Sequence, residues 1–165
     1  MSMSHAKELT ERHIHFRWMI RSDWEQVEAI DRQLLWPWGM VQLMEHLRRR
    51  NVIARVAECR VTGEILGCQL SGLEKNRVEL LYLAVKQDAP PVQYRRRGVG
   101  SLMVDSVKSR TSATSRSSIW CYVPADLVDL QLMLRDQDFL AVQIDRQYDR
   151  YVMRWLHPQT QGTEI

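Results

Sequence analysis

The alternation of hydrophobic and polar positions divides the chain into short elements of two kinds. Apolar residues recur at helical spacing in four segments, which predicts helices that begin near residues 22, 41, 98 and 124. Runs rich in β-branched, aromatic and small residues predict strands over 16–20, 51–59, 65–73, 78–85, 119–123, 139–144 and 151–155. The predicted order is β-α-α-β-β-β-α-β-α-β-β, which indicates an α/β fold with a mixed central sheet.

The run from Val78 to Val85 is the most apolar of the predicted strands. Glu79 is its only charged residue. An almost continuous apolar run is typical of a strand that is buried on both faces. We therefore expect this strand at the centre of the sheet.

Composition indicates one ordinary soluble domain. The chain has 165 residues, of which 45% are hydrophobic and 26% charged. Its net charge of +3 is too small to indicate a nucleic-acid or membrane partner, and no apolar run approaches the roughly 20 residues of a membrane span. We expect a single domain over residues 14–157, between a flexible N-terminal tail (1–13) and a C-terminal tail (158–165).

The cysteines indicate a reducing compartment. Cys59, Cys68 and Cys121 are odd in number, contain no Cys-x-x-Cys pair and match no zinc-binding spacing. The histidines form no ligand pattern either, so we expect no metal. Free thiols are typical of the cytoplasm, which is the location that we expect.

The segment after the central strand has the character of an anion-binding site. Gly98-Val99-Gly100 opens a predicted helix, and Arg95-Arg96-Arg97 precedes it. The first N–H groups of a helix have no internal partner and lie at its positive end. Glycine lets the backbone approach a ligand closely, so this start predicts a phosphate site, to which the arginines add charge. The segment matches neither a Walker loop nor the dinucleotide-binding glycine pattern.

The Arg-x-x-Gly-x-Gly spacing of Arg95, Gly98 and Gly100 resembles the pyrophosphate-binding motif of the GNAT N-acetyltransferase superfamily. In that family the motif follows a central strand that ends in an apolar-Ala-Val run, and here Leu83-Ala84-Val85 precedes it. The resemblance extends over about residues 16–151 and is nearest to the ribosomal-protein alanine acetyltransferase branch. Further segments that carry it are Arg17-Trp18-Met19, Pro37-Trp38, Ile65-Leu66-Gly67 and Asp138-Phe139.

The resemblance implies the GNAT fold, in which the sheet is split at the cofactor cleft and the central strand bulges. It implies acetyl-CoA as cosubstrate and direct attack of a primary amine on the thioester. Backbone N–H groups of Leu83, Ala84 and Val85 would bind the pantetheine and the thioester carbonyl, and those of residues 96–101 would hold the pyrophosphate. The implied cofactor-binding residues are Leu83, Ala84, Val85, Arg95, Arg96, Arg97, Gly98, Val99, Gly100 and Ser101.

The catalytic positions depart from the alanine acetyltransferase branch. Tyr122 stands where that branch has a Glu, while Leu127 and Leu134 stand where it has an Asn and a Tyr. A leucine cannot donate a proton. Two functions therefore stay open. One is an N-acetyltransferase acting on a primary amine, such as a peptide or protein N-terminal α-amine. The other is a catalytically impaired acyl-CoA-binding sensor or regulatory module.

Three residues are the predicted catalytic candidates. Glu79 matches the position at which histone acetyltransferases of the superfamily have a general base that acts through water. The alternative is a Glu at a strand start that either faces solvent or pairs with Arg77. Tyr122 and Tyr148 are phenols near the expected cleft, where Tyr82 is a further phenol, and Tyr148 resembles the tyrosine that shapes the acceptor peptide site.

Two further expectations concern the acceptor side and partners. Trp36 and Trp38 either pack at the helix break that Pro37 causes or line the acceptor entrance. The expected partners are acetyl-CoA and an amine acceptor, either a peptide or a small molecule. A homodimer is common in the family.

Overall fold

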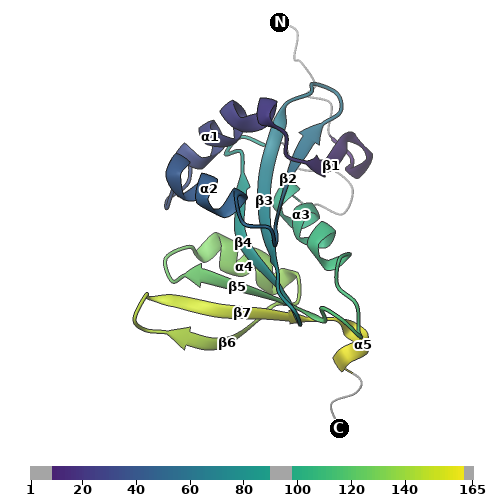
Figure 1. Cartoon of the computed structure of the whole chain (residues 1–165), viewed down its shortest axis with the longest axis vertical. Coiled ribbons are helices and arrows are strands. Elements are labelled where there is room, and N and C mark those ends of the chain that lie inside the picture. Colours follow the sequence, from purple (N-terminus) through teal and green to yellow (C-terminus); the bar gives the residue numbers. More distant parts are fainter. Residues whose placement is uncertain (1–8, 90–97, 162–165) are drawn as a thin grey trace, which may run out of the picture.

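The computed structural model describes residues 9–89 and 98–161 and shows one seven-stranded sheet in the order β1-β2-β3-β4-β5-β7-β6 (Figure 1). Most neighbouring strands are antiparallel, and β4 and β5 are parallel. The strands are β1 (Ile14–Trp18), β2 (Val52–Cys59), β3 (Ile65–Leu73), β4 (Val78–Val85), β5 (Ser118–Pro124), β6 (Leu140–Asp145) and β7 (Arg150–Leu156). The predicted element order and mixed α/β class are confirmed.

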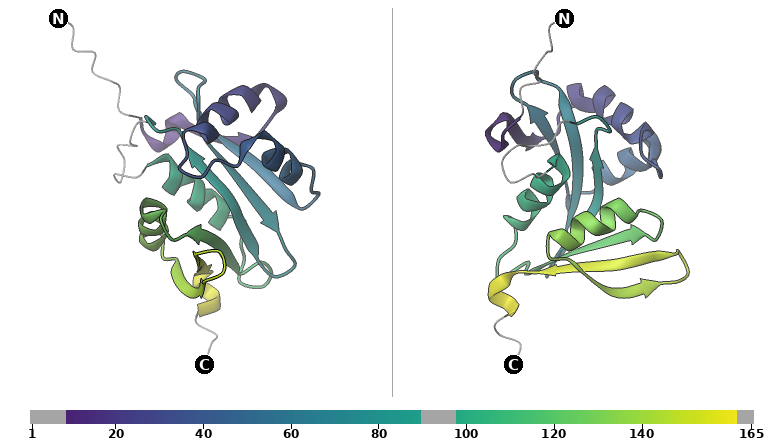
Figure 2. Two further views of the ribbon diagram at one scale, coloured as in Figure 1. Left: turned by 90° about the vertical axis from the view of Figure 1, so that its left-hand side faces the viewer. Right: turned by 180° about the vertical axis from the view of Figure 1, so that it is seen from behind.

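Helices cover both faces of the sheet (Figure 2). They are α1 (Trp24–Arg32), α2 (Gly39–Leu47), α3 (Val99–Lys108), α4 (Val128–Asp136) and the short α5 (Pro158–Gln161). On one face, Val27 and Leu43 of α1 and α2 pack against Leu70 of β3. On the other face, α3 packs in two clusters, one of which it shares with Leu134 of α4. The sheet thus has one buried cluster on the face of α1 and α2 and two on the face of α3.

The sheet is split between β4 and β5. These two strands pair at only three positions, Val78 with Ile119, Glu79 with Trp120 and Leu80 with Cys121. Beyond Leu80, β4 stays paired with β3, and β5 stays paired with β7 as far as Pro124. The two strands therefore diverge, as the resemblance implies.

A bulge in β4 lies at the point of divergence. Leu70 of β3 opposes Tyr82, but the next residue, Ser71, opposes Leu80, which leaves Leu81 as an extra residue. Side chains of β4 alternate between buried and half-buried. This differs from the predicted strand buried on both faces, because β5 leaves β4 just beyond the bulge.

The break between α1 and α2 depends on one buried carboxylate. Asp31, which is 1% exposed, accepts hydrogen bonds from the backbone N–H groups of Trp38 and Gly39, at 3.0 and 2.9 Å. It also accepts one from the hydroxyl of Tyr82, at 2.8 Å. These bonds end α1 earlier than the apolar pattern predicts and leave Leu35 64% exposed. The loop over residues 33–38 is thereby fixed against β4.

The ends of the described chain carry further structure. Leu9 is buried beside α3, and residues 11–13 form one 3-10 turn. The helix α5 occupies part of the segment expected as a C-terminal tail. The domain limits and a homodimer stay predictions. Within residues 9–89 and 98–161, no helix has both the length and the apolarity needed to cross a membrane.

Candidate functional site

A narrow slot of about 110 Å³ lies where β4 and β5 separate. Its walls are largely apolar, and its polar side-chain groups are the phenols of Tyr82 and Tyr122, the indole N–H groups of Trp36 and Trp38 and the thiol of Cys121. The lining combines both strands with the α1–α2 loop and the start of α4. The residues are Leu34, Trp36, Trp38, Leu80, Leu81, Tyr82, Leu83, Cys121, Tyr122, Pro124, Leu127 and Leu130.

The edge of β4 that faces the slot presents backbone N–H groups. The N–H of Lys86, just after β4, donates to the carbonyl of Leu66 on the β3 side, at 2.8 Å. Because successive N–H groups of a strand point to opposite sides, those of Val85 and Leu83 point toward the gap that β5 leaves. That of Ala84 points toward β3. The alternation thus directs the N–H groups of Leu83 and Val85 toward the gap between β4 and β5, whereas that of Ala84 is directed toward β3; their role in cofactor binding stays a prediction.

The start of α3 forms the second part of the site. Gly98 is the N-cap residue, with φ −84° and ψ 171°, and no side chain caps the helix. The N–H of Leu102 donates to the carbonyl of Gly98 at 3.3 Å. The N–H groups of Val99, Gly100 and Ser101 precede it and therefore have no acceptor within the helix. They lie at its positive end, where an anion is favoured.

The two glycines of this start differ in what surrounds them. Among the residues that the structure describes, no heavy atom lies within 4 Å of a Cβ on Gly98. A Cβ on Gly100 would lie 3.3 Å from Cγ2 of Val85 and 3.7 Å from Cε of Met133. Gly100 thus allows α3 to approach the end of β4 closely. The predicted residues Arg95, Arg96 and Arg97 lie outside the described residues.

One guanidinium brings the two predicted tyrosines together. The guanidinium carbon of Arg150 lies 4.5 Å from the ring centre of Tyr122 and 5.0 Å from that of Tyr148. Asp145 holds this guanidinium through an ion pair of 2.9 Å. Tyr122, which is 39% exposed, also lines the slot. Both phenols therefore lie on the face of the sheet opposite α3 and α4.

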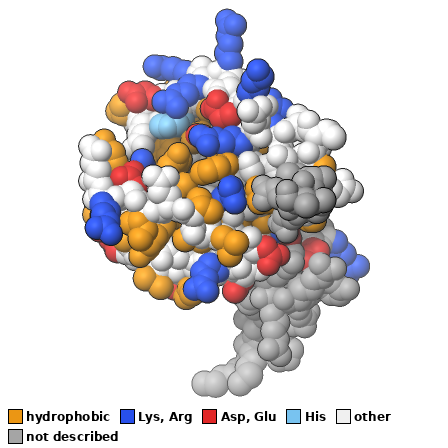
Figure 3. All heavy atoms as spheres, turned by 90° about the horizontal axis from the view of Figure 1, so that it is seen from below, with side chains coloured by type: hydrophobic (Ala, Val, Ile, Leu, Met, Phe, Trp, Pro, Cys, Tyr) orange, Lys and Arg blue, Asp and Glu red, His pale blue; other side chains and the backbone are white. Residues whose placement is uncertain are grey.

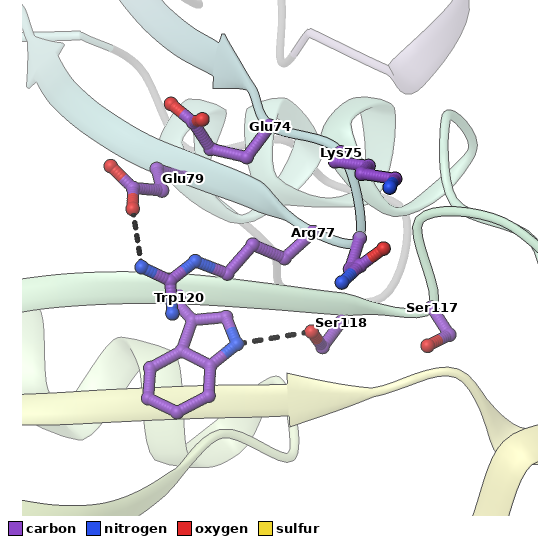
Figure 4. A pocket seen from close by; sticks show the side chains of 8 residues that line it. Glu74, Lys75, Arg77, Glu79, Ser117, Ser118 and Trp120 are labelled. Atoms are coloured by element: carbon purple, nitrogen blue, oxygen red, sulfur yellow. Dashed lines mark hydrogen bonds and ion pairs between the residues drawn. The ribbon is translucent and has the colours of Figure 1, made fainter.

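Glu79 lies at the closed end of the split, opposite Trp120. Its carboxylate accepts a hydrogen bond of 2.8 Å from Nη2 of Arg77, whose guanidinium carbon lies 4.7 Å from the Trp120 ring centre (Figure 4). These three residues line a second pocket, which shares no lining residue with the slot. The structure thus contains the Arg77 pair that the sequence left open, and it does not bring Glu79 into the slot with Tyr122.

Two buried groups at the slot stay protonated. Burial raises the pKa of the Cys121 thiol to about 12, so it is not a nucleophile near neutral pH. Burial, together with the hydrogen bond to Asp31, also raises the pKa of Tyr82. The Tyr82 hydroxyl is therefore a donor to Asp31 and is committed to holding the α1–α2 loop.

Sequence reasoning missed two acidic residues that organise the slot. Asp31 anchors the loop before α2, and Asp126 accepts from the indole N–H of Trp36 across the slot. Both tryptophans of the helix break line the slot. Trp38 also packs on Tyr82, with ring centres 4.8 Å apart, so it packs at the helix break as well as lining the slot.

Other site chemistry is not evident in the described ranges. Residues 9–89 and 98–161 contain no group of three or more His, Cys, Asp or Glu side chains that could hold a metal ion. The three cysteines are buried and unpaired. The cytoplasmic location rests on those thiols and stays a prediction.

The fold of this chain matches solved structures, although its sequence matches no family model. No protein-family model matches the sequence, and no curated protein matches it. Solved structures do match. Naa20 from Chaetomium thermophilum in complex with a bisubstrate analogue is 14% identical, with a TM-score of 0.73 over 91% of this chain and 90% of that chain.

Two further structures agree. The PaiA N-acetyltransferase from Thermoplasma acidophilum in complex with coenzyme A is 14% identical, with a TM-score of 0.71 over 87% of this chain and 99% of that chain. The ribosomal-protein-S18-alanine N-acetyltransferase from Escherichia coli is 12% identical, with a TM-score of 0.69 over 87% of this chain and 93% of that chain. The chain has the fold of the GNAT N-acetyltransferases, as its sequence motifs predict.

Proposed function

We propose that this protein is an acetyl-CoA-dependent N-acetyltransferase whose acceptor is a peptide or protein N-terminal α-amine. The observation that carries the proposal is the coincidence of two features at one place. The parted strands β4 and β5 open beside the uncapped start of α3, where Gly100 lies in contact with Val85. A thioester ligand with a pyrophosphate needs both features together. Solved structures with this fold, one holding coenzyme A and one a bisubstrate analogue, support the assignment.

Both α3 and β4 contribute backbone N–H groups that bind the cofactor. The N–H groups of Val99, Gly100 and Ser101 bind the pyrophosphate, and the sequence adds Arg95–Arg97 as counter-charges. The N–H groups of Leu83 and Val85 bind the pantetheine and the thioester carbonyl. Acetyl-CoA supplies an acetyl group activated as a thioester. Donors fixed at that carbonyl stabilise the negative charge that develops on its oxygen during attack.

The acceptor side uses the opposite face of the sheet. The amine nitrogen forms a bond to the carbonyl carbon, and the carbon–sulfur bond breaks. Glu79 takes the proton of the amine through water, because its carboxylate lies on this face but outside the slot. Tyr122 donates a proton to the departing thiolate. Tyr148 shapes the acceptor entrance together with Tyr122 and Arg150.

Calorimetric titration with acetyl-CoA and with CoA tests the cofactor site. We expect saturable binding that Gly98→Glu weakens at least tenfold. The new carboxylate repels phosphate there, and no neighbour within 4 Å obstructs it. Gly98→Ala is the control for the added Cβ, and Gly100→Glu tests the tighter position. Absence of binding in the native chain would refute both the enzyme and the sensor.

A second candidate is an acyl-CoA-binding sensor without turnover. The observation that favours it is the apolar lining at α4, since Leu127 lines the slot and Leu134 is fully buried in the core. Neither can donate a proton. Release of CoA in the presence of free-amine peptides, polyamines and small amines separates the two candidates. CoA binding without release across that panel would favour the sensor.

A further inference from the structure

We propose that the uncovered face of β5 and β7 binds acidic side chains of the acceptor polypeptide, downstream of the acetylated amine, and that Arg154 is the residue that selects them. This inference deepens the proposed function and rests on it for the position of the amine. It concerns a surface next to the slot, and the observations that carry it are register, charge and continuity.

The register of β5 and β7 places aromatic and cationic side chains on one face. Trp120 opposes Arg154, Tyr122 opposes Val152 and Pro124 opposes Arg150. Residues directly opposite each other in antiparallel strands point to the same side. The alternate residues of β5 and β7 are buried with α3 and α4 in the core on the other face; they are Ile119, Cys121, Val123, Met153 and Trp155. The aromatic and cationic row is thus on the face that α3 and α4 leave open.

The arginines of this face differ in their partners. Arg77 is paired with Glu79, and Arg150 is paired with Asp145. Arg154 lies 5.7 Å from the ring centre of Trp120, and it pairs with no carboxylate in the part of the chain that the structure describes. The guanidinium groups of Arg77 and Arg154 therefore both lie beside the Trp120 ring, and only that of Arg77 is paired with a carboxylate in the described part of the chain. Stacking on the ring holds the Arg154 guanidinium in place while leaving its N–H groups for a ligand.

The row continues directly from the slot. Tyr122 lines the slot, and Trp120 lies two residues away on the same face, about 7 Å along the strand. An extended acceptor with its amine in the slot passes Arg150 first and then reaches Arg154 about four residues later, because the two arginines are four positions apart on β7. Carboxylates suit guanidinium donors because two parallel hydrogen bonds can form. Polyamines and lysine-rich tails are disfavoured by the same charge.

The lower end of the molecule carries charges of both signs. Seen from below, where β7 and β6 lie in Figure 1, Lys and Arg side chains as well as Asp and Glu side chains are scattered among hydrophobic ones (Figure 3). The preference for acidic side chains therefore rests on the row of Trp120 and Arg154.

Binding of short peptides by the full chain tests the inference without requiring turnover. Three pentapeptides with a free N-terminal Ala and a C-terminal fluorophore carry Glu, Gln or Lys at positions 2–5, and their dissociation constants are measured by anisotropy. We expect the Glu peptide to bind at least tenfold more tightly than the Gln peptide, and the Lys peptide most weakly. The preference shrinks as salt is added, because the charges are partly exposed.

Variants of Arg154 give the decisive arm. Arg154→Gln removes the preference, and Arg154→Glu reverses it in favour of the Lys peptide. Circular dichroism melts confirm that both variants are folded, and the Gln variant suffices if the Glu variant is not. Arg135→Glu is the matched control, because Arg135 lies on α4 beside a pocket of the other face. It keeps the native preference.

Several outcomes would overturn the inference. Equal binding of the three peptides would do so, as would a preference that both Arg154 variants retain. A single-stranded RNA octamer that binds more tightly than the Glu peptide would assign the face to nucleic acid instead. Acetylation of all three peptides at equal rates would support the proposed acetyltransferase activity and refute the preference for acidic acceptors. Arg154-dependent binding of acidic peptides without their acetylation by acetyl-CoA would support the preference and refute the activity.

Discussion

The indole N–H of Trp36 donates to both carboxylate oxygens of Asp126, at 3.0 and 3.1 Å, across a separation of 90 residues in the chain. Trp36 belongs to the loop between α1 and α2, and Asp126 to the turn between β5 and α4. The bond therefore joins the two parts of the molecule that the split in the sheet separates. Trp36 also lines the slot, so the bond lies beside it.

Loss of this bridge should alter acceptor binding more than stability. Trp36 is 58% exposed, so Trp36→Phe should cost less than about 1 kcal/mol of unfolding free energy. We expect the KM for a peptide acceptor to rise about fivefold, since about 1 kcal/mol of positioning is lost. The Kd for CoA should stay unchanged. Trp18→Phe is the control because Trp18 is equally exposed, at 58%, and does not line the slot. An unchanged KM would show that the bridge does not constrain the acceptor.

Substitution of Glu79 decides whether it is a base or only a partner of Arg77. Glu79→Gln should lower kcat about 100-fold, which is the lower range for loss of a general base, and leave CoA binding intact. Glu74→Gln is the matched control, because Glu74 lines the same pocket and its Oε1 accepts from Asn51. If kcat is the same in both variants and in the native chain, Glu79 serves the ion pair alone.

Gly67 is where the packing of α3 on the sheet is tightest. A Cβ there would lie 2.7 Å from Sδ of Met103 and 3.0 Å from the carbonyl oxygen of Ala84. The thioether can move, but the carbonyl is part of the β4 backbone. Gly67→Ala should therefore lower the free energy of unfolding by about 1–3 kcal/mol, as overpacked cores do. Urea denaturation measures the loss, and Gly98→Ala, which lacks such contacts and changes only a helix N-cap, should lose less than Gly67→Ala.

The ion pair between Arg17 and Asp23 should make stability depend on acid pH. The Arg17 guanidinium donates to both Asp23 carboxylate oxygens, at 2.7 and 2.8 Å, and this is the main cause of the lowered pKa of Asp23. A lowered pKa in the folded state adds stability above the ordinary value of 3.8. That stability is lost as the pH falls through the lower, folded value.

Unfolding free energies between about pH 2 and pH 7 test this prediction. Asp23→Asn should cost about 2 kcal/mol at neutral pH, which is typical of a charged hydrogen bond, and should flatten the acid limb of the curve. Asp129→Asn, at an exposed position of α4, is the control and should leave the limb unchanged. An Asp23→Asn curve parallel to the native one would refute the assignment.

The pattern of hydrophobic and polar residues predicted the elements well where turn-forming residues mark the same boundaries as the periodicity. The two strands over 65–73 and 78–85 coincide with β3 and β4, because Gly63, at φ +75°, fits the turn that the sequence indicates before β3. The split and the bulge came from the family resemblance, since no periodicity contains them. The end of α1 was predicted too late, because the bonds that Asp31 accepts come from residues 38, 39 and 82.

The acceptor side was the part least accessible from sequence. The contact of Trp36 with Asp126 joins distant loops, and the row of Trp120 and Arg154 exists only through the register of β5 and β7. Neither leaves a local pattern. The start of α3 was accessible because glycine spacing and helix polarity act within a few residues of the chain.

The extra residue at Leu81 has a consequence for how β4 distributes its side chains. Below it, Val78 and Leu80 face the core that β5, α3 and α4 share; above it, Tyr82 and Ala84 face the core of α1 and α2. Side chains alternate with a period of two, so in a regular strand residues 78, 80, 82 and 84 would all face one side. The extra residue reverses the alternation beyond Leu81, and a single strand thereby contributes side chains to the packing on both faces of the sheet.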